Sequence, residues 1–238
     1  MSDPTAIILL TTAASIGFLH TMIGVDHYLP FVVIGRARKW TLRRTLGITA
    51  ACGLGHVVGS ILLGFIGIGL GVALDQLTWV ESVRGSIAAW SLIAFGLVYG
   101  AWGWLRAQRN QQHAHAHTHS DGTVHTHPHR HGGEHLHAHE EKSGRTLTTW
   151  ALFLVFVFGP CEALIPLLMA PAWAHNWLLV AGVTATFALV TIGTMLTLVT
   201  VGYLGLRISA FQQLDRYAHA LAGFAIAASG LAIQVLGI

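Results

Sequence analysis

GFLHTMIGVDHYLPF (residues 17–31) lies inside an apolar run, and it holds two histidines and an aspartate with no other charge near them, His20, Asp26 and His27. Ionisable side chains in such a setting are costly and mark functional sites by default. Gly24 and Pro30 lie among them, and both residue types allow a helix to unwind or kink. We therefore expect a broken first helix that presents the three side chains to an internal site. Core histidines bonded to neighbouring helices are the alternative.

The chain as a whole is too apolar for an ordinary soluble domain. Of its 238 residues, 53% are hydrophobic and 10% are charged, whereas soluble domains have about 25% charged residues. A membrane-spanning helix needs about 20 mainly apolar residues. Six stretches meet this requirement: 6–34, 45–73, 82–105, 147–172, 177–204 and 216–236. We predict an all-α integral protein of the cell (plasma or inner) membrane, and the start, MSDPTA, lacks the features of a cleaved signal peptide.

The basic residues predict how the chain is oriented. Lys and Arg concentrate on the cytoplasmic side of a membrane protein. With both termini outside, twelve of the thirteen Lys and Arg residues lie inside and only Arg84 lies outside. These basic clusters flank the spans and have no interleaved aromatic residues, so we do not expect nucleic-acid binding. Two cysteines far apart in the sequence indicate neither a disulfide framework nor a CxxC pair.

An internal repeat divides the chain into two halves. A shift of about 135 positions lays GITAACGLGHVVG (47–59) on GVTATFALVTIGT (182–194), and AAWSLIAFGLVYG (88–100) on AGFAIAASGLAIQ (222–234). Small apolar residues are so frequent that chance accounts for part of this match. Asp26 and Pro30 fall on Glu162 and Pro166. Three spans per half require opposite orientations, which predicts two inverted three-helix repeats, residues 1–105 and 147–238, as in many secondary transporters.

A histidine-rich segment, residues 106–146, joins the halves. It contains eleven of the sixteen histidines and almost no large apolar side chains. We predict a disordered cytoplasmic loop because such a composition cannot form a packed core. Imidazole is the commonest metal-binding side chain, so we expect this loop to bind metal ions. A solvated linker is the alternative.

Further candidate ligands lie in other spans. LGHVVGS (54–60) makes His56 the only ionisable residue of the second span, and FGPCEALIPLLMAP (158–171) makes Glu162 the only charge within the fourth. Cys161 is either a soft metal ligand or a small buried hydrophobe. The fifth span and the span ends hold weaker candidates. We expect the threonines either to line the same route or to bond their own helix, and the two histidines to be interfacial or capping: Thr191, Thr194, Thr197, His175 and His219.

The donor set indicates which ion the site would take. Imidazole suits nickel, cobalt, zinc and copper(II), whereas oxygen ligands alone suit magnesium or calcium. The sequence therefore predicts a divalent transition metal as substrate, and partners that are metal ions and the lipid bilayer. The predicted metal-site residues are Asp26, His27, His56, His20, Glu162 and Cys161.

HTMIGVDHYLPF (20–31) together with LGHVVGS resembles the nickel/cobalt transporter superfamily, including its nickel/cobalt efflux and urease-accessory-type branches. The histidine-rich loop is similar to those of the efflux members. The resemblance implies a nickel or cobalt permease in which His20, Asp26, His27 and His56 contact the metal. The family pattern is H-x4-D-H, but five residues separate His20 from Asp26 here, which turns His20 by about 100° in a straight helix. Asp26 and His27 are therefore favoured over His20.

The leading hypothesis is a secondary transporter of Ni2+ or Co2+, or of Zn2+, with no prosthetic group and no enzymatic activity. The chain has no Walker A motif for ATP and no H-E-x-x-H motif for a metal hydrolase. A sulfite or organosulfur anion exporter of related architecture is one alternative, and a membrane-anchored metal sensor is another. A thiol-disulfide electron transporter is excluded, because it needs a cysteine in both halves and Cys161 falls on Val25 or Asp26.

Overall fold

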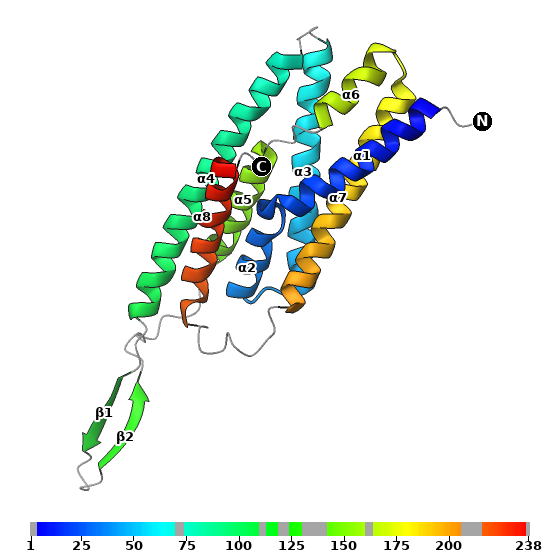
Figure 1. Ribbon diagram of the computed structural model, residues 1–238. Coiled ribbons are helices and arrows are strands. Elements are labelled where there is room, and N and C mark those ends of the chain that lie inside the picture. The colour runs from blue at the N-terminus through cyan, green and yellow to red at the C-terminus, as the bar shows by residue number, and fades with distance from the viewer. Residues whose placement is uncertain are drawn as a thin grey trace.

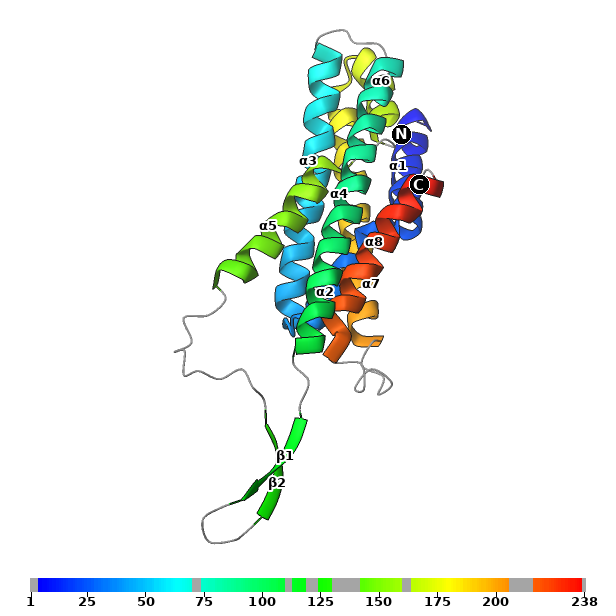
Figure 2. The same ribbon diagram turned by 90° about the vertical axis from the view of Figure 1, so that its left-hand side faces the viewer.

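The computed structural model describes residues 4–69, 74–109, 113–118, 124–129, 142–159, 164–205 and 216–236. Helices form an elongated bundle, and a two-stranded hairpin projects from one end of it (Figures 1 and 2). In chain order the elements are α1 (Pro4–Ile23), the 3-10 turn η1 (Val25–His27), α2 (Leu29–Ala37), α3 (Leu42–Gly69), α4 (Leu74–Arg109), β1 (His113–Thr118), β2 (Val124–His129), α5 (Lys142–Phe158), α6 (Leu164–Trp173), α7 (Trp177–Gly205) and α8 (Ala218–Leu236).

Five of these helices, α1, α3, α4, α7 and α8, are long and apolar enough to cross a membrane. Two shorter apolar helices, α5 and α6, occupy the stretch that was predicted as a single span, 147–172. The prediction of an all-α bundle is thus confirmed, and five of its helices have the length and composition that a membrane protein needs. The predicted break of the first span is also confirmed, since α1, η1 and α2 follow one another where the sequence has Gly24 and Pro30.

Helices α4 and α8 pack at close range through glycines. A side-chain carbon added to Gly96 or Gly223 would collide with the backbone of the facing helix. Further along, Gly230 lies against the backbone of Ala89, and only six residues of α8 follow it. The first turns of α4 therefore extend past the end of α8, as Figure 1 shows. This leaves one face of α4 uncovered by α8 at the level of its residues 78–86.

The histidine-rich segment contains an antiparallel hairpin. β1 pairs with β2 in a register that places His113 opposite His129, His115 opposite His127 and His117 opposite His125. These twelve residues belong to the segment for which disorder was predicted. Histidine occupies every second position there, alternating with alanine and threonine in β1 and with valine, threonine and proline in β2, and this period of two suits a strand. Composition alone concealed that pattern, and residues 110–112, 119–123 and 130–141 of the segment lie outside the described residues.

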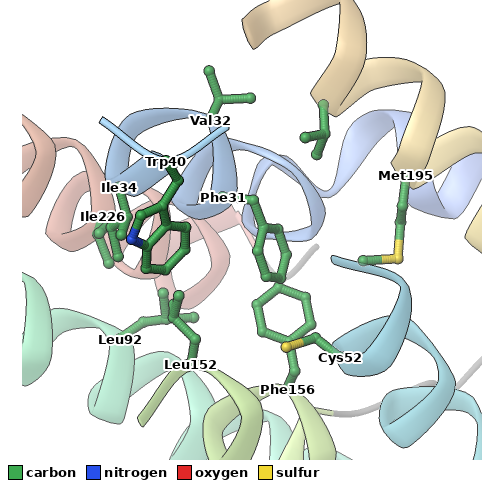
Figure 3. Close-up of a cluster of buried hydrophobic side chains, with 11 residues drawn as sticks. Phe31, Val32, Ile34, Trp40, Cys52, Leu92, Leu152, Phe156, Met195 and Ile226 are labelled. Carbon is green, nitrogen blue, oxygen red and sulfur yellow. The ribbon is translucent and has the colours of Figure 1, made fainter. Parts of the chain in front are cut away.

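Two apolar clusters fill the bundle on either side of the break in the first span. The cluster on the hairpin side contains Phe31 and Phe156, whose ring centroids are 4.7 Å apart (Figure 3). The free cysteine Cys52 is buried in the same cluster. The second cluster joins α1, α3, α6 and α7 and is centred on the fully buried Phe187. The break between α1 and α2 lies between these clusters, so polar groups there are shielded from the ends of the bundle.

Candidate metal site

The break itself depends on Gly24. A side-chain carbon on Gly24 would lie 2.5 Å from His27 Nδ1 and 3.0 Å from Asp26 Oδ1, so no other residue fits without moving them. Its N–H donates to His20 O at 3.0 Å, and its own carbonyl accepts from the N–H of His27 at 3.1 Å. Pro30 lies in the first turn of α2, where a missing N–H removes no helical bond. The chain therefore leaves one helix and begins the next with its backbone largely bonded.

Three imidazole rings meet at this break. His20 comes from the last turn of α1, His27 from η1 and His56 from the middle of α3. The ring centroid of His27 is 4.8 Å from that of His20 and 5.2 Å from that of His56. One ligand nitrogen from each ring lies within 4.8 Å of the others. Nitrogens on one tetrahedral ion lie about 3.3 Å apart, so modest side-chain rotations would bring all three onto a metal.

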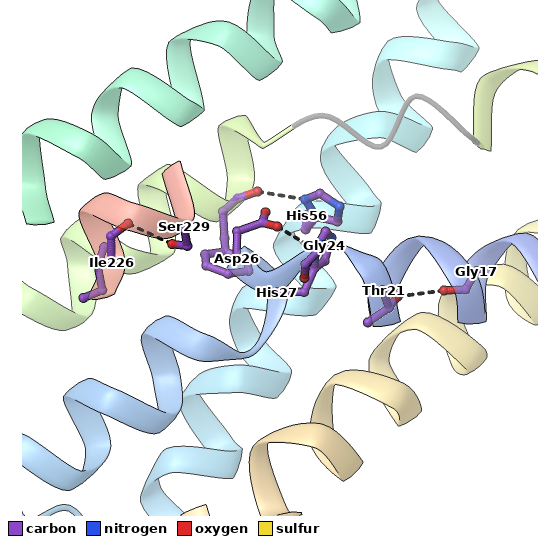
Figure 4. Close-up of polar contacts among 9 residues, drawn as sticks. Gly17, Thr21, Gly24, Asp26, His27, His56, Ile226 and Ser229 are labelled. Carbon is purple, nitrogen blue, oxygen red and sulfur yellow. Dashed lines mark hydrogen bonds and ion pairs between the residues drawn. The ribbon is translucent and has the colours of Figure 1, made fainter. Parts of the chain in front are cut away.

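Hydrogen bonds fix which ring nitrogen is free in His27 and in His56 (Figure 4). His56 Nδ1 donates to Phe156 O at 3.2 Å, and His27 Nδ1 lies 3.1 Å from Gly24 O and 3.2 Å from Asp26 Oδ1. Because carbonyl and carboxylate oxygens only accept, these contacts place the proton on Nδ1 and the lone pair of a neutral ring on Nε2. Histidines that bind a metal through one ring nitrogen usually donate the N–H of the other nitrogen to a carbonyl or carboxylate oxygen, as these two rings do.

The Nε2 atoms of the three rings are notable for lacking hydrogen-bond partners among the described residues. Nε2 of His20, His27 and His56 is buried and has no hydrogen-bond partner among the described residues. His27 and His56 are each only 3% exposed. Unpaired polar atoms in an interior are rare because each carries a desolvation cost. Three clustered imidazoles with buried, unpartnered Nε2 atoms form a set that a bound cation would satisfy.

A cavity of about 720 Å³ adjoins the rings. His20, Asp26, His27 and His56 line it, and polar side chains of α4 and α8 continue the lining: Thr78, Ser82, Ser86 and Gln234. These α4 residues belong to the face that α8 leaves uncovered. A shallower groove of about 560 Å³ on α4 shares Ser82 and Ser86, and none of its lining residues is ionisable. The imidazole cluster thus opens into a partly polar space rather than a sealed core.

The predicted ligands are placed unequally. His20, His27 and His56 come together, whereas Asp26 contacts the Nδ1 side of His27 and so acts through that ring. The five-residue gap favoured Asp26 over His20 as a metal ligand. In the structure it is His20 that lies in the cluster with His27 and His56, and Asp26 lies at the other nitrogen of His27. The helix ends at Ile23, so the rotation computed for a straight helix does not apply. Glu162 and Cys161 lie outside the described residues.

The weaker candidates lie away from the cavity. None of the three candidate threonines in α7 lines it: Thr191 is buried beside Gly17, and Thr197 Oγ1 donates to Gly193 O of its own helix. His175 is exposed at the α6–α7 turn, with Nδ1 3.0 Å from Trp173 O. His219 lies at the start of α8, with Nδ1 2.7 Å from Tyr99 Oη. The expected placement of both histidines near helix ends is confirmed.

An ion pair near the site was missed at the level of sequence. Glu81 is fully buried in α4, and Arg84 Nη1 donates to its Oε1 at 2.5 Å. The predicted third span began at residue 82, which left Glu81 out of it, and Arg84 was considered only as the one basic residue on the outer side. The signal that could have found the pair is the spacing of the two residues, since side chains three apart are neighbours on a helix.

Comparison of the chain with protein-family models, with curated proteins and with solved structures finds no match.

Proposed function

We propose that the protein is a secondary transporter of divalent transition-metal ions, nickel and cobalt foremost, and that His20, His27 and His56 bind the transported ion. The observation that carries this proposal is the cluster of three imidazoles, which has one ligand nitrogen of each ring within 4.8 Å of the others and buried Nε2 atoms without a hydrogen-bond partner among the described residues. The resemblance of HTMIGVDHYLPF and LGHVVGS to the nickel/cobalt transporter superfamily supports the same conclusion.

The chemistry of the cluster favours a transition metal over magnesium or calcium. Imidazole nitrogens suit nickel, cobalt and zinc, whereas magnesium and calcium prefer oxygen ligands. Asp26 accepts a hydrogen bond from the Nδ1–H of His27, which makes Nε2 of that ring a stronger metal ligand. Three protein ligands leave coordination positions open for water, and a transported ion must bind weakly enough to leave again.

The order of the elements fits a two-part transporter. A broken span, α1–α2, is followed by the long helices α3 and α4, and a second broken span, α5–α6, is followed by α7 and α8. This order is the one expected of inverted repeats over residues 1–105 and 147–238, with a site where the broken spans meet. The two halves would rock about the imidazole cluster, with both chain ends outside and the histidine-rich hairpin collecting metal ions in the cytoplasm.

The alternatives have less support. An anion exporter needs a free positive charge in its pathway, but the guanidinium of Arg84 donates to Glu81 and to two backbone carbonyls. A membrane-anchored sensor that works through its hairpin has no need of buried imidazoles beside a cavity. Both alternatives leave the three unpaired nitrogens without a role.

Uptake into proteoliposomes tests the proposal. We expect the purified chain to move Ni2+ or Co2+ in a saturable manner, with Zn2+ and Mn2+ as comparison ions, and His56→Ala to abolish this uptake. His175→Ala, which changes an exposed histidine away from the cavity, is the matched control and should transport normally. No uptake of any of the four ions would refute the proposal, and sulfite export unaffected by His56→Ala would favour the anion exporter.

A further inference from the structure

Helix α5, the first part of the second broken span, ends inside the bundle, where the N–H of Gly159 donates to Phe156 O at 3.1 Å. Helix α5 stops at Phe158, and α6 begins at Leu164. The last carbonyls of any helix have no partner within it, and in a bilayer they must be satisfied by other protein groups. Arg84 of α4 supplies two donors, since its Nη2 lies 3.1 Å from Val157 O and 3.2 Å from Gly159 O.

Glu81 holds the guanidinium in this place. The side chain of Glu81 is 0% exposed and that of Arg84 is 17% exposed, and their contact is 2.5 Å long. A buried charge without a partner is strongly destabilising, whereas a bonded pair is tolerated. The pair adds no net charge beside the cavity, so it would not repel a divalent ion. It also places a positive group at the negative end of the α5 dipole.

The same helix end holds one of the three imidazoles. Phe156 O accepts the Nδ1–H of His56, one residue before the first carbonyl that Arg84 contacts. The fit between α3 and this end is tight, because a side-chain carbon on Gly59 would lie 2.9 Å from Val157 O and 3.3 Å from Arg84 Nη2. A carbon on Gly159 would lie 3.1 Å from His56 Nδ1. A displacement of the end of α5 would therefore be transmitted to the His56 ring.

We propose that Arg84, anchored by Glu81, is a positioning residue for His56. It fixes the carbonyl end of α5 so that Phe156 O holds the His56 ring with Nε2 toward His20 and His27. This inference rests on the proposed metal site and adds to it a residue that contacts no metal. Carbonyl ends of broken helices bind coupling cations in many transporters, and here a protein cation fills that role.

Cobalt binding provides the test, because the visible spectrum of Co2+ reports the number and geometry of its ligands. We would use the full chain in lipid nanodiscs with the eleven histidines between residues 113 and 139 changed to asparagine, here called the loop-Asn chain. Arg84→Gln should weaken Co2+ binding about tenfold, as loss of a ligand's outer partner does, and should change the cobalt spectrum. Arg84→Lys should recover part of both. Arg43→Gln, at an exposed site in the first turn of α3, is the control.

The outcomes separate this inference from the proposed function. Wild-type affinity and spectrum in a folded Arg84→Gln chain would overturn the inference and leave the metal site intact. If Arg84→Gln does not fold, the double variant Glu81→Gln/Arg84→Gln removes both charges and leaves no unpaired ion. Unchanged cobalt binding there would likewise overturn the inference, and weakened binding with an altered spectrum would support it. Failure of the loop-Asn chain itself to bind Co2+ would refute the proposed function.

Discussion

The two broken spans meet at the imidazole cluster, and they differ in the groups that they contribute to it. The break between α1 and α2 carries two of the three imidazoles and satisfies its backbone largely within its own chain segment. The described end of α5 carries no imidazole, and its carbonyls bond side chains of α3 and α4, namely His56 and Arg84. Two similar interruptions of a helix can therefore contribute to one site in different ways. In the proposed metal site, the first break presents two of the ligands, and the second orients a ligand that comes from another helix.

The largest effect should come from removing an imidazole. Changing His20, His27 or His56 to alanine takes away one of the three proposed nitrogen ligands, and no other imidazole among the described residues lines the cavity to replace it. We expect the affinity for Ni2+ or Co2+ in the loop-Asn chain to fall by more than about 100-fold, beyond the loss caused by changing an outer partner. Calorimetric titration would measure it. A variant whose metal affinity fell by less than about tenfold would show that its ring is not a ligand.

The second-largest effect should come from Gly24→Ala, which alters the break between α1 and α2. The added methyl group would lie 2.5 Å from His27 Nδ1, a distance that forces the ring to move. We expect a loss of affinity of about 100-fold, near the upper limit for changes beside a metal ligand. Gly47→Ala is the control, because a side-chain carbon there meets nothing within 4 Å. Equal binding by the two variants would contradict the described geometry of the break.

Much of the first break could be predicted from the sequence, and much of the second could not. Glycine and proline among ionisable residues indicated an interruption, but not its position. A one-turn difference in where α1 stops decides whether His20 faces the cluster. The contact between Arg84 and the end of α5 joins residues more than seventy positions apart. Such pairing depends on how α4 packs against α5, and no local pattern encodes it.

A smaller effect should follow Asp26→Asn, which keeps the size of the side chain and removes its charge. The amide oxygen can still accept from His27 Nδ1, and Gly24 O remains as a second acceptor at 3.1 Å. We expect metal affinity to fall about tenfold, the lower limit for an outer partner of a histidine ligand. Titration of the loop-Asn chain with Ni2+ would measure the change. A loss as large as that of His27→Ala would indicate that Asp26 binds the ion directly.

The smallest effect should come from Gly159→Ala at the second break. The new methyl group would lie 3.1 Å from both His56 Nδ1 and Phe156 O, a crowded distance that small shifts can relieve. We expect a loss of less than about tenfold in affinity, well below that of Gly24→Ala. Parallel titrations of the two variants would establish the order. The reverse order would mean that the second break, rather than the first, controls the geometry of the cluster.

The most direct test of the central proposal is X-ray absorption spectroscopy of the loop-Asn chain loaded with one equivalent of Ni2+ in nanodiscs. Five histidines remain in that chain, and His175 and His219 lie at helix ends away from the cavity. We predict three imidazole ligands, reduced to two by His56→Ala and unchanged by His175→Ala. A nickel ion surrounded by oxygen alone, or a histidine count unaffected by His56→Ala, would contradict the assignment of this cluster as the metal site.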